Sequence, residues 1–86
     1  MNQAQFEKAA QEIQKLTQRP SNEELLQLYA LFKQSTEGDV KGSRPGMLDL
    51  KGRAKYDAWA KLKGKPSESC RGDYIILVDS LKKKYG

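Results

Sequence analysis

The stretch "PSNEELLQLYALFKQSTEGD", residues 20–39, predicts a helix whose two ends are both marked. Ser21 and Glu24 have the spacing of a capping box, in which each side chain accepts a hydrogen bond from the other residue's backbone N–H. The helix is therefore expected to start near Ser21 or Asn22. Gly38 offers a C-terminal stop. The apolar side chains between these signals recur at helical spacing: Leu25, Leu26, Leu28, Tyr29, Leu31 and Phe32.

The segments on either side of this helix are predicted to be another helix and a long connector. Residues 6–16 carry apolar side chains at the helical repeat, and Pro20 ends that segment. Residues 38–49 are rich in glycine, proline and charge, which predicts a long connector. At about a dozen residues it is long for a loop without structure, so we expect it to pack down or to have a role.

Two more helices are expected after the connector. Residues 50–64 return to helical spacing and end at Gly64, and a last helix starts at "PSES", residues 66–69. No segment alternates with period two for long enough to be a strand. The chain is thus predicted to be a single all-α domain, residues 1–86, with four helices. The expected buried residues are Ala54, Ala58, Trp59 and Leu62 on the third helix and Tyr74, Ile75, Val78, Leu81 and Tyr85 on the fourth.

The composition limits the function classes open to the chain. Sixteen Lys and Arg stand against eleven Asp and Glu, and the formal charge of +5 favours an anionic partner such as nucleic acid, a phosphorylated metabolite or an acidic membrane. The absence of histidine removes the commonest general base and metal ligand. Cys70 alone allows no internal disulfide and no cysteine-rich zinc site, and we expect it to be a small, partly buried helix residue. The polar N-terminus and short apolar runs predict a soluble, cytoplasmic protein.

Aromatic and basic residues form a candidate binding site if the predicted helices pack together. Residues at i, i+3 and i+4 share a helix face. Lysines neutralise phosphates and aromatic rings stack on bases, so the set suits a nucleotide with several phosphates. The alternative is a group of solvated lysines beside tyrosines at the edge of the core. No glycine-rich phosphate loop and no base–nucleophile pair occurs, so side chains would have to hold the nucleotide. The set comprises Tyr29, Phe32 and Lys33, then Lys51 and Lys55, and finally Tyr74.

Three strings give the chain a resemblance to a known family: "LYALFKQSTEGD" at 28–39, "RPGMLDLKGRAKYDAWAKLKG" at 44–64 and "DYIILVDSLKKKYG" at 73–86. With the patterns YxxFKQxTxGD and PGMxDxKGxAKxxAW, the chain resembles the acyl-CoA-binding protein family over nearly its whole length. The resemblance implies a four-helix, up-down-down-up bundle that binds and carries long-chain acyl-CoA thioesters without catalysis, cofactor or metal. It also implies a monomer that contacts acyl-CoA-using enzymes or membranes transiently.

The resemblance also implies roles for individual residues. Tyr29, Lys33, Lys55 and Tyr74 match the positions that hold the CoA head group, with the lysines on the ribose 3′-phosphate and its neighbours and the aromatic rings around the adenine. Lys51, Phe32 and Gln14 match further head-group positions. Phe32 replaces the usual tyrosine and keeps only the stacking face, and Gln14 replaces a frequent lysine. Ala10, Ile13 and Leu25 are expected to line a groove for the acyl chain, in which each buried CH₂ contributes roughly 0.8 kcal/mol.

Some departures from the family pattern lie outside this site. Tyr56 stands where many members have a second tryptophan, and Gly72 falls inside the last predicted helix, at a cost of roughly 1 kcal/mol relative to alanine. Ile76 and Leu77 stand where charged residues are usual, and we expect either a contact surface or two harmless exposed side chains. A nucleic-acid-binding helical module is the alternative function. It is disfavoured because basic residues interleave with acidic ones instead of following one helix face.

Overall fold

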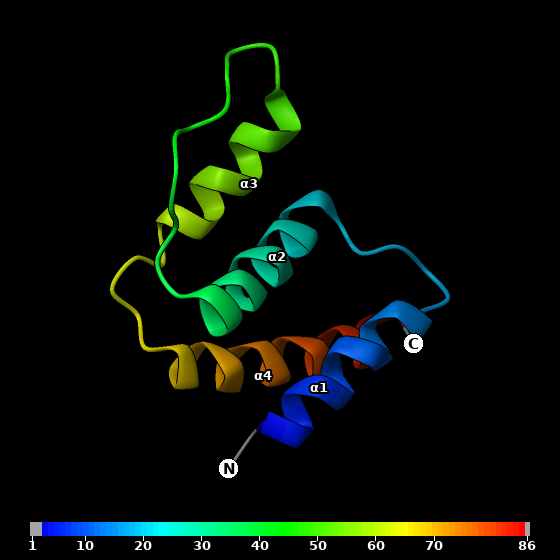
Figure 1. The fold of residues 1–86 in the computed structure, drawn as a ribbon. Coiled ribbons are helices and arrows are strands. Elements are labelled where there is room, and N and C mark those ends of the chain that lie inside the picture. The colour runs from blue at the N-terminus through cyan, green and yellow to red at the C-terminus, as the bar shows by residue number, and fades with distance from the viewer. Residues whose placement is uncertain (1–2, 86) are drawn as a thin grey trace.

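The computed structural model describes residues 3–85, and its regular structure consists of four α-helices and one 3₁₀ turn. These are α1 (Gln3–Glu12), η1 (Ile13–Lys15), α2 (Asn22–Glu37), α3 (Leu50–Ala60) and α4 (Ser67–Tyr85). α1 and α4 run in one general direction, and α2 and α3 run in the other (Figure 1). The prediction of an all-α, up-down-down-up bundle is confirmed.

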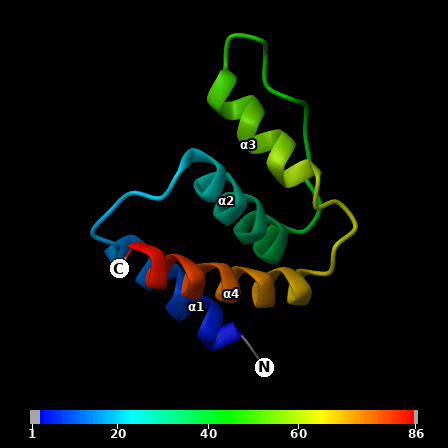
Figure 2. The ribbon, with the colours of Figure 1, turned by 180° about the vertical axis from the view of Figure 1, so that it is seen from behind.

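The longest helix, α4, packs against both α1 and α2, whereas α3 packs against α2 alone. Figure 2 shows the same arrangement from behind, with α3 standing apart from α1 and α4. The core therefore lies where α1, α2 and α4 meet. Its buried members are Phe6, Ala9, Leu28, Tyr74, Val78 and Leu81.

Both ends of α2 form as the sequence predicts. Ser21 Oγ accepts from the Glu24 N–H at 3.2 Å, and Glu24 Oε1 accepts from the Ser21 N–H at 2.8 Å, which completes the capping box. Gly38 has a φ of +80°, in the region that favours glycine, and its N–H donates to the Gln34 carbonyl. This helix carries four of the ten candidate site residues, so the caps also fix the register of those four.

The first and third helices are shorter than predicted. α1 ends at Glu12 and tightens into η1, after which Leu16 is extended while still packing against the core. α3 ends at Ala60, and a turn leads to Gly64, whose φ is +88°. Only Trp59 of the expected stripe on this helix is buried, because α3 is covered by α2 alone. The other three members, Ala54, Ala58 and Leu62, are half-buried.

The buried face of α4 agrees with the prediction, with one correction. Tyr74, Val78 and Leu81 are buried, and the neighbouring positions Ile75 and Tyr85 are half-buried. Cys70 is fully buried rather than partly so, and burial raises the pKa of its thiol, as expected for a packing residue. The expectation that Ile76 and Leu77 are both exposed is wrong for Leu77. That side chain packs against the core on the α2 side of the helix, whereas Ile76 is 69% exposed.

A buried amide ties the C-terminal ends of α2 and α3 to the start of α4. Gln34 is 1% exposed, and its Oε1 accepts from Trp59 Nε1 at 3.1 Å. Its Nε2 donates to Asp39 Oδ1 and to the Lys65 backbone carbonyl. The backbone carbonyl of Gln34 accepts from Ser67 Oγ. Every polar atom of this amide is thus paired, as burial requires. α3 is therefore fixed at its Trp59 end.

The connector between α2 and α3 packs down onto α3. Arg44 forms a bidentate ion pair with Asp57, with N–O distances of 2.9 and 2.7 Å. Tyr56, the residue that departs from the family's tryptophan, donates its hydroxyl to the Gly42 carbonyl at 3.1 Å. These bonds explain how a dozen residues without regular structure are held in place.

Candidate functional site

Tyr29, in the middle of α2, has an ammonium group near its ring from each of two helices. Lys55 Nζ of α3 lies 5.4 Å from the ring centroid, and Lys33 Nζ of α2 lies 6.0 Å from it. Lys33 Nζ is also 5.1 Å from the Trp59 ring. An ammonium group is attracted to the face of an aromatic ring at such distances. The ring thus holds two positive charges close to each other on the surface.

Lys33 is the one of these two lysines that has a carboxylate partner. Glu37, one turn later on α2, forms an ion pair with it and raises the pKa of the Lys33 ammonium. The group is therefore fully charged at neutral pH. The pair is partly exposed, so an anionic ligand can compete with Glu37 for this ammonium group.

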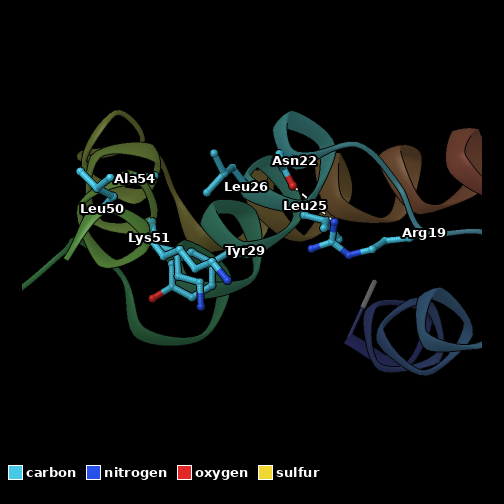
Figure 3. A pocket seen from close by; sticks show the side chains of 9 residues that line it. Arg19, Asn22, Leu25, Leu26, Tyr29, Leu50, Lys51 and Ala54 are labelled. Carbon is cyan, nitrogen blue, oxygen red and sulfur yellow. Dashed lines mark hydrogen bonds between the residues drawn. The ribbon is translucent and has the colours of Figure 1, made fainter. Parts of the chain in front are cut away.

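A pocket of about 550 Å³ opens between α2 and the N-terminal half of α3, and we call it the α2–α3 pocket. In Figure 3, Lys51 and Tyr29 point into the same space, while Arg19 and Asn22 lie at the other end. Arg19 Nη1 donates to Asn22 Oδ1 at 3.4 Å. The pocket thus combines aliphatic walls with three cations. Its lining consists of Arg19, Asn22, Leu25, Leu26, Tyr29, Leu50, Lys51, Ala54 and Lys55.

A second pocket, of about 490 Å³, lies between α1, α2 and α4, and we call it the aromatic pocket. The Phe32 ring is 38% exposed there and stacks on Phe6, with centroids 5.5 Å apart. The Tyr74 ring lies 6.0 Å from Phe32, and burial raises the pKa of its phenol, which is therefore protonated at neutral pH. The pocket is lined by Ala10, Ile13, Gln14, Pro20, Leu25, Leu28, Tyr29, Phe32 and Tyr74.

The structure brings the ten residues singled out in the sequence into one region, because Tyr29 and Leu25 line both pockets. The structure divides these residues between the two pockets. Ala10 and Ile13, expected along an acyl chain, lie beside the rings of Phe32 and Tyr74 in the aromatic pocket. Gln14 lies there too, whereas Lys51 and Lys55 line the α2–α3 pocket and Lys33 lies at the Tyr29 ring.

Sequence reasoning missed several residues that line the α2–α3 pocket. Arg19 precedes Pro20 in a short linker, outside the helix faces on which the predicted cations lie. Its only sequence signal is a cation next to a proline that begins a capped helix. Asn22 and the aliphatic wall carried helix signals in the sequence but no signal for a binding site. That wall is Leu26, Leu50 and Ala54.

Two other kinds of site were searched for in the described residues. Within residues 3–85, no group of three or more Cys, Asp or Glu side chains is placed to hold a metal ion. None of the four helices in this range combines the length and hydropathy that a membrane crossing requires.

Comparison with known proteins gives a consistent result. The family model described as "Acyl CoA binding protein" matches residues 3–78. The chain is 54% identical over 81 residues to a Drosophila melanogaster protein named "Acyl-CoA-binding protein homolog", with 94% of both chains covered. It is 49% identical over 81 residues to the Caenorhabditis elegans "Acyl-CoA-binding protein homolog 1", again with 94% of each chain covered.

Solved structures show the same relationship. The crystal structure of Oryza sativa Acyl-CoA-Binding Protein 2 superposes with a TM-score of 0.91 at 43% identity, over 95% of this chain and 89% of that one. The solution structure of the yeast Acyl Coenzyme A Binding Protein gives a TM-score of 0.78 at 46% identity, over 99% and 98% of the two chains. Both the sequence and the fold are thus shared along most of the chain.

Proposed function

The chain belongs to the acyl-CoA-binding protein family, and from this premise we propose that it binds long-chain acyl-CoA thioesters and carries them without chemical change. Such a ligand has a flat adenine, a highly anionic middle part and a long apolar chain. A protein that binds it needs one surface for each of these three parts, placed close together.

The single observation that carries the proposal is the position of Tyr29. Its ring lies at the junction of two apolar pockets and has the ammonium groups of Lys33 and Lys55 on it. Charge-assisted bonds to phosphate oxygens are roughly twice as strong as neutral ones. We place the phosphates at this junction, with Lys51 and Arg19 as further cations in the α2–α3 pocket.

The two pockets suit the two ends of the ligand. A flat base fits the aromatic pocket, where the partly exposed Phe32 ring offers stacking area beside the buried Tyr74 ring and Gln14 offers an amide for hydrogen bonding. The acyl chain fits the aliphatic wall of the α2–α3 pocket, formed by Leu26, Leu50 and Ala54, with Leu25 beside it. In this assignment Ala10 and Ile13 lie beside the adenine base, whereas the sequence predicts them along the acyl chain.

The alternative of a nucleic-acid-binding module fits the surface charges poorly. Several cations outside the site are neutralised by carboxylates, for example Arg44 by Asp57 and Lys65 by Asp73. A reader of a phosphate backbone instead needs cations along one continuous face. We also propose that the protein is not an enzyme, since its sequence has no histidine and the site has no paired general acid and base.

Titration with palmitoyl-CoA tests the proposal, with free CoA and a DNA duplex as comparisons at the same moderate salt. We expect palmitoyl-CoA to bind much more tightly than free CoA, and the duplex not to bind. Preferential binding of the duplex, or equal binding of the two CoA compounds, would overturn the carrier function. A thioester hydrolysis assay on the same samples should show no turnover.

A further inference from the structure

A third apolar cavity lies on the other side of the α2–α3 contact, and we call it the distal groove. Its volume is about 690 Å³, larger than either pocket of the candidate site. Its walls are mainly aliphatic and come from α2, from α3 and the turn after it, and from α4. The aliphatic residues that line it include Leu26, Ala54, Ala58, Leu62 and Leu77.

The distal groove adjoins the α2–α3 pocket. Leu26 and Ala54 line both cavities, so these two side chains stand at the boundary between them. Both are labelled in Figure 3, Leu26 on α2 and Ala54 on α3. Because the alanine side chain is a single methyl group, α3 contributes little side-chain volume to the contact with α2 at this point.

The N-terminal end of α3 is loosely packed. Leu50, at the start of the helix, is 74% exposed, and Ala54 is only half-buried. The fixed end of the helix lies one to two turns further on, where Trp59 bonds to Gln34. The two helices thus hold together at the Trp59 end and meet through small side chains at the Ala54 end.

We propose that the distal groove receives the far end of a long acyl chain whose near part lies in the α2–α3 pocket. The inference rests on the proposed function and adds the path of the chain past Leu26 and Ala54. An uncharged alkyl end fits this groove, because its lining carries one cation, Lys61, against two carboxylates, Asp57 and Glu23. A second phosphate-bearing ligand would meet no excess of positive charge there.

The chain offers a matched pair of variants for a test. Ala58 lines the distal groove but not the α2–α3 pocket, so Ala58→Leu fills the groove while leaving the candidate site intact. Ala60→Leu is the control, since Ala60 is another half-buried alanine of α3 that lines neither cavity. Dissociation constants would be measured by calorimetry for acyl-CoA with chains of about 8 to 20 carbons, in two-carbon steps.

Each further CH₂ that leaves water is worth up to about fourfold in affinity. In the unmodified protein and in Ala60→Leu, affinity should continue to rise towards the longest chains. In Ala58→Leu, the shortest chains should bind within about twofold of the unmodified protein, and the longest should lose about tenfold or more. An equal loss at all lengths, or no loss at any, would overturn the proposal. Failure of all chains to bind the unmodified protein would instead refute the proposed function.

A second measurement needs no variant and remains valid if Ala58→Leu does not fold. Methyl NMR of the unmodified protein should show the Leu62 and Leu77 signals shifting with a 20-carbon chain and staying in place with an 8-carbon chain. Both residues line the distal groove and neither lines a pocket of the candidate site. Signals that respond equally to both ligands, or to neither, would contradict occupation of the groove by the chain end.

Discussion

Replacing Lys55 with alanine tests the assignment of the phosphate site. Lys55 is exposed, and its Nζ lies 5.4 Å from the Tyr29 ring centroid. Within residues 3–85, no carboxylate lies within ion-pairing distance of it. The substitution thus removes a cation that neutralises no acidic group of the protein, and its main effect should be on binding.

The expected magnitude follows from this geometry. A hydrogen bond to a charged group is worth roughly 1.5–3 kcal/mol, which corresponds to a loss of roughly 10- to 150-fold in affinity. The cost to folding is bounded by the exposed cation–π contact with Tyr29, roughly 0.5–1 kcal/mol. Alanine, the best helix former, offsets part of that cost.

Calorimetry with palmitoyl-CoA and thermal melting on the same samples would measure both effects. Lys63→Ala is the matched control, since Lys63 is another exposed lysine, just after α3, that lines none of the cavities described above. We expect Lys55→Ala to bind at least about tenfold more weakly than Lys63→Ala at low salt, with a smaller difference at high salt, where charges are screened. Small and equal losses for the two variants would refute the assignment, as would a loss that simply follows a lower melting temperature.

Five further predictions concern the ligand, the rings and the carboxylates. Free CoA should bind at least about 100-fold more weakly than palmitoyl-CoA in calorimetry, since the aliphatic wall then goes unused; similar constants would contradict a chain site. Tyr29→Phe should lower affinity by about one neutral hydrogen bond, 0.5–1.5 kcal/mol, with little change in melting temperature. Phe32→Ala should lower both affinity and melting temperature, because Phe32 stacks on Phe6 of the core and lines the aromatic pocket. Phe32→Tyr should bind as tightly as the parent or more tightly. Changes in melting temperature without changes in affinity would mean that Tyr29 and Phe32 have only structural roles. Glu37→Gln should tighten binding by roughly two- to fivefold by releasing Lys33, and weaker binding would argue against Lys33 as a phosphate ligand. The pKa of Glu24 is about 2 in the folded chain against 4.5 for the free group, so the unfolded state takes up the proton first and stability falls as pH drops from about 4.5 to about 2. Between pH 4.5 and about 2, the melting temperature should fall less steeply with pH in Glu24→Gln than in the parent. An equal fall in both proteins would refute the contribution of Glu24 to the pH dependence of stability.

The parts of the fold that the sequence predicts are those set by local interactions. The bonds between Ser21 and Glu24 span three residues, and the stop at Gly38 depends on a backbone angle of one residue. Tyr29 and Lys33 share a face because they lie on one helix, whatever its partners are. Such features do not depend on how the helices pack, which is why their prediction from sequence was correct.

Features set by packing could not be predicted in the same way. Gln34 reads as an ordinary polar helix residue, yet it is 1% exposed because Trp59, 25 positions later, donates to it. The half-burial of Ala54 follows from α3 having one neighbour instead of two. The division of the site into two pockets likewise depends on how α2 crosses its neighbours, and Ala10 lines the same pocket as Phe32 and Tyr74.

The net charge of +5 acquires a specific meaning when the ion pairs are placed on the structure. Arg44, Lys82 and Lys84 each bond to a carboxylate and add little to the field around the molecule. The three cations that line the α2–α3 pocket are different, since no carboxylate of residues 3–85 lies within ion-pairing distance of them. Three cations without an ion-pairing carboxylate therefore meet at one pocket, which favours capture of a compact anion. Those three cations are Arg19, Lys51 and Lys55.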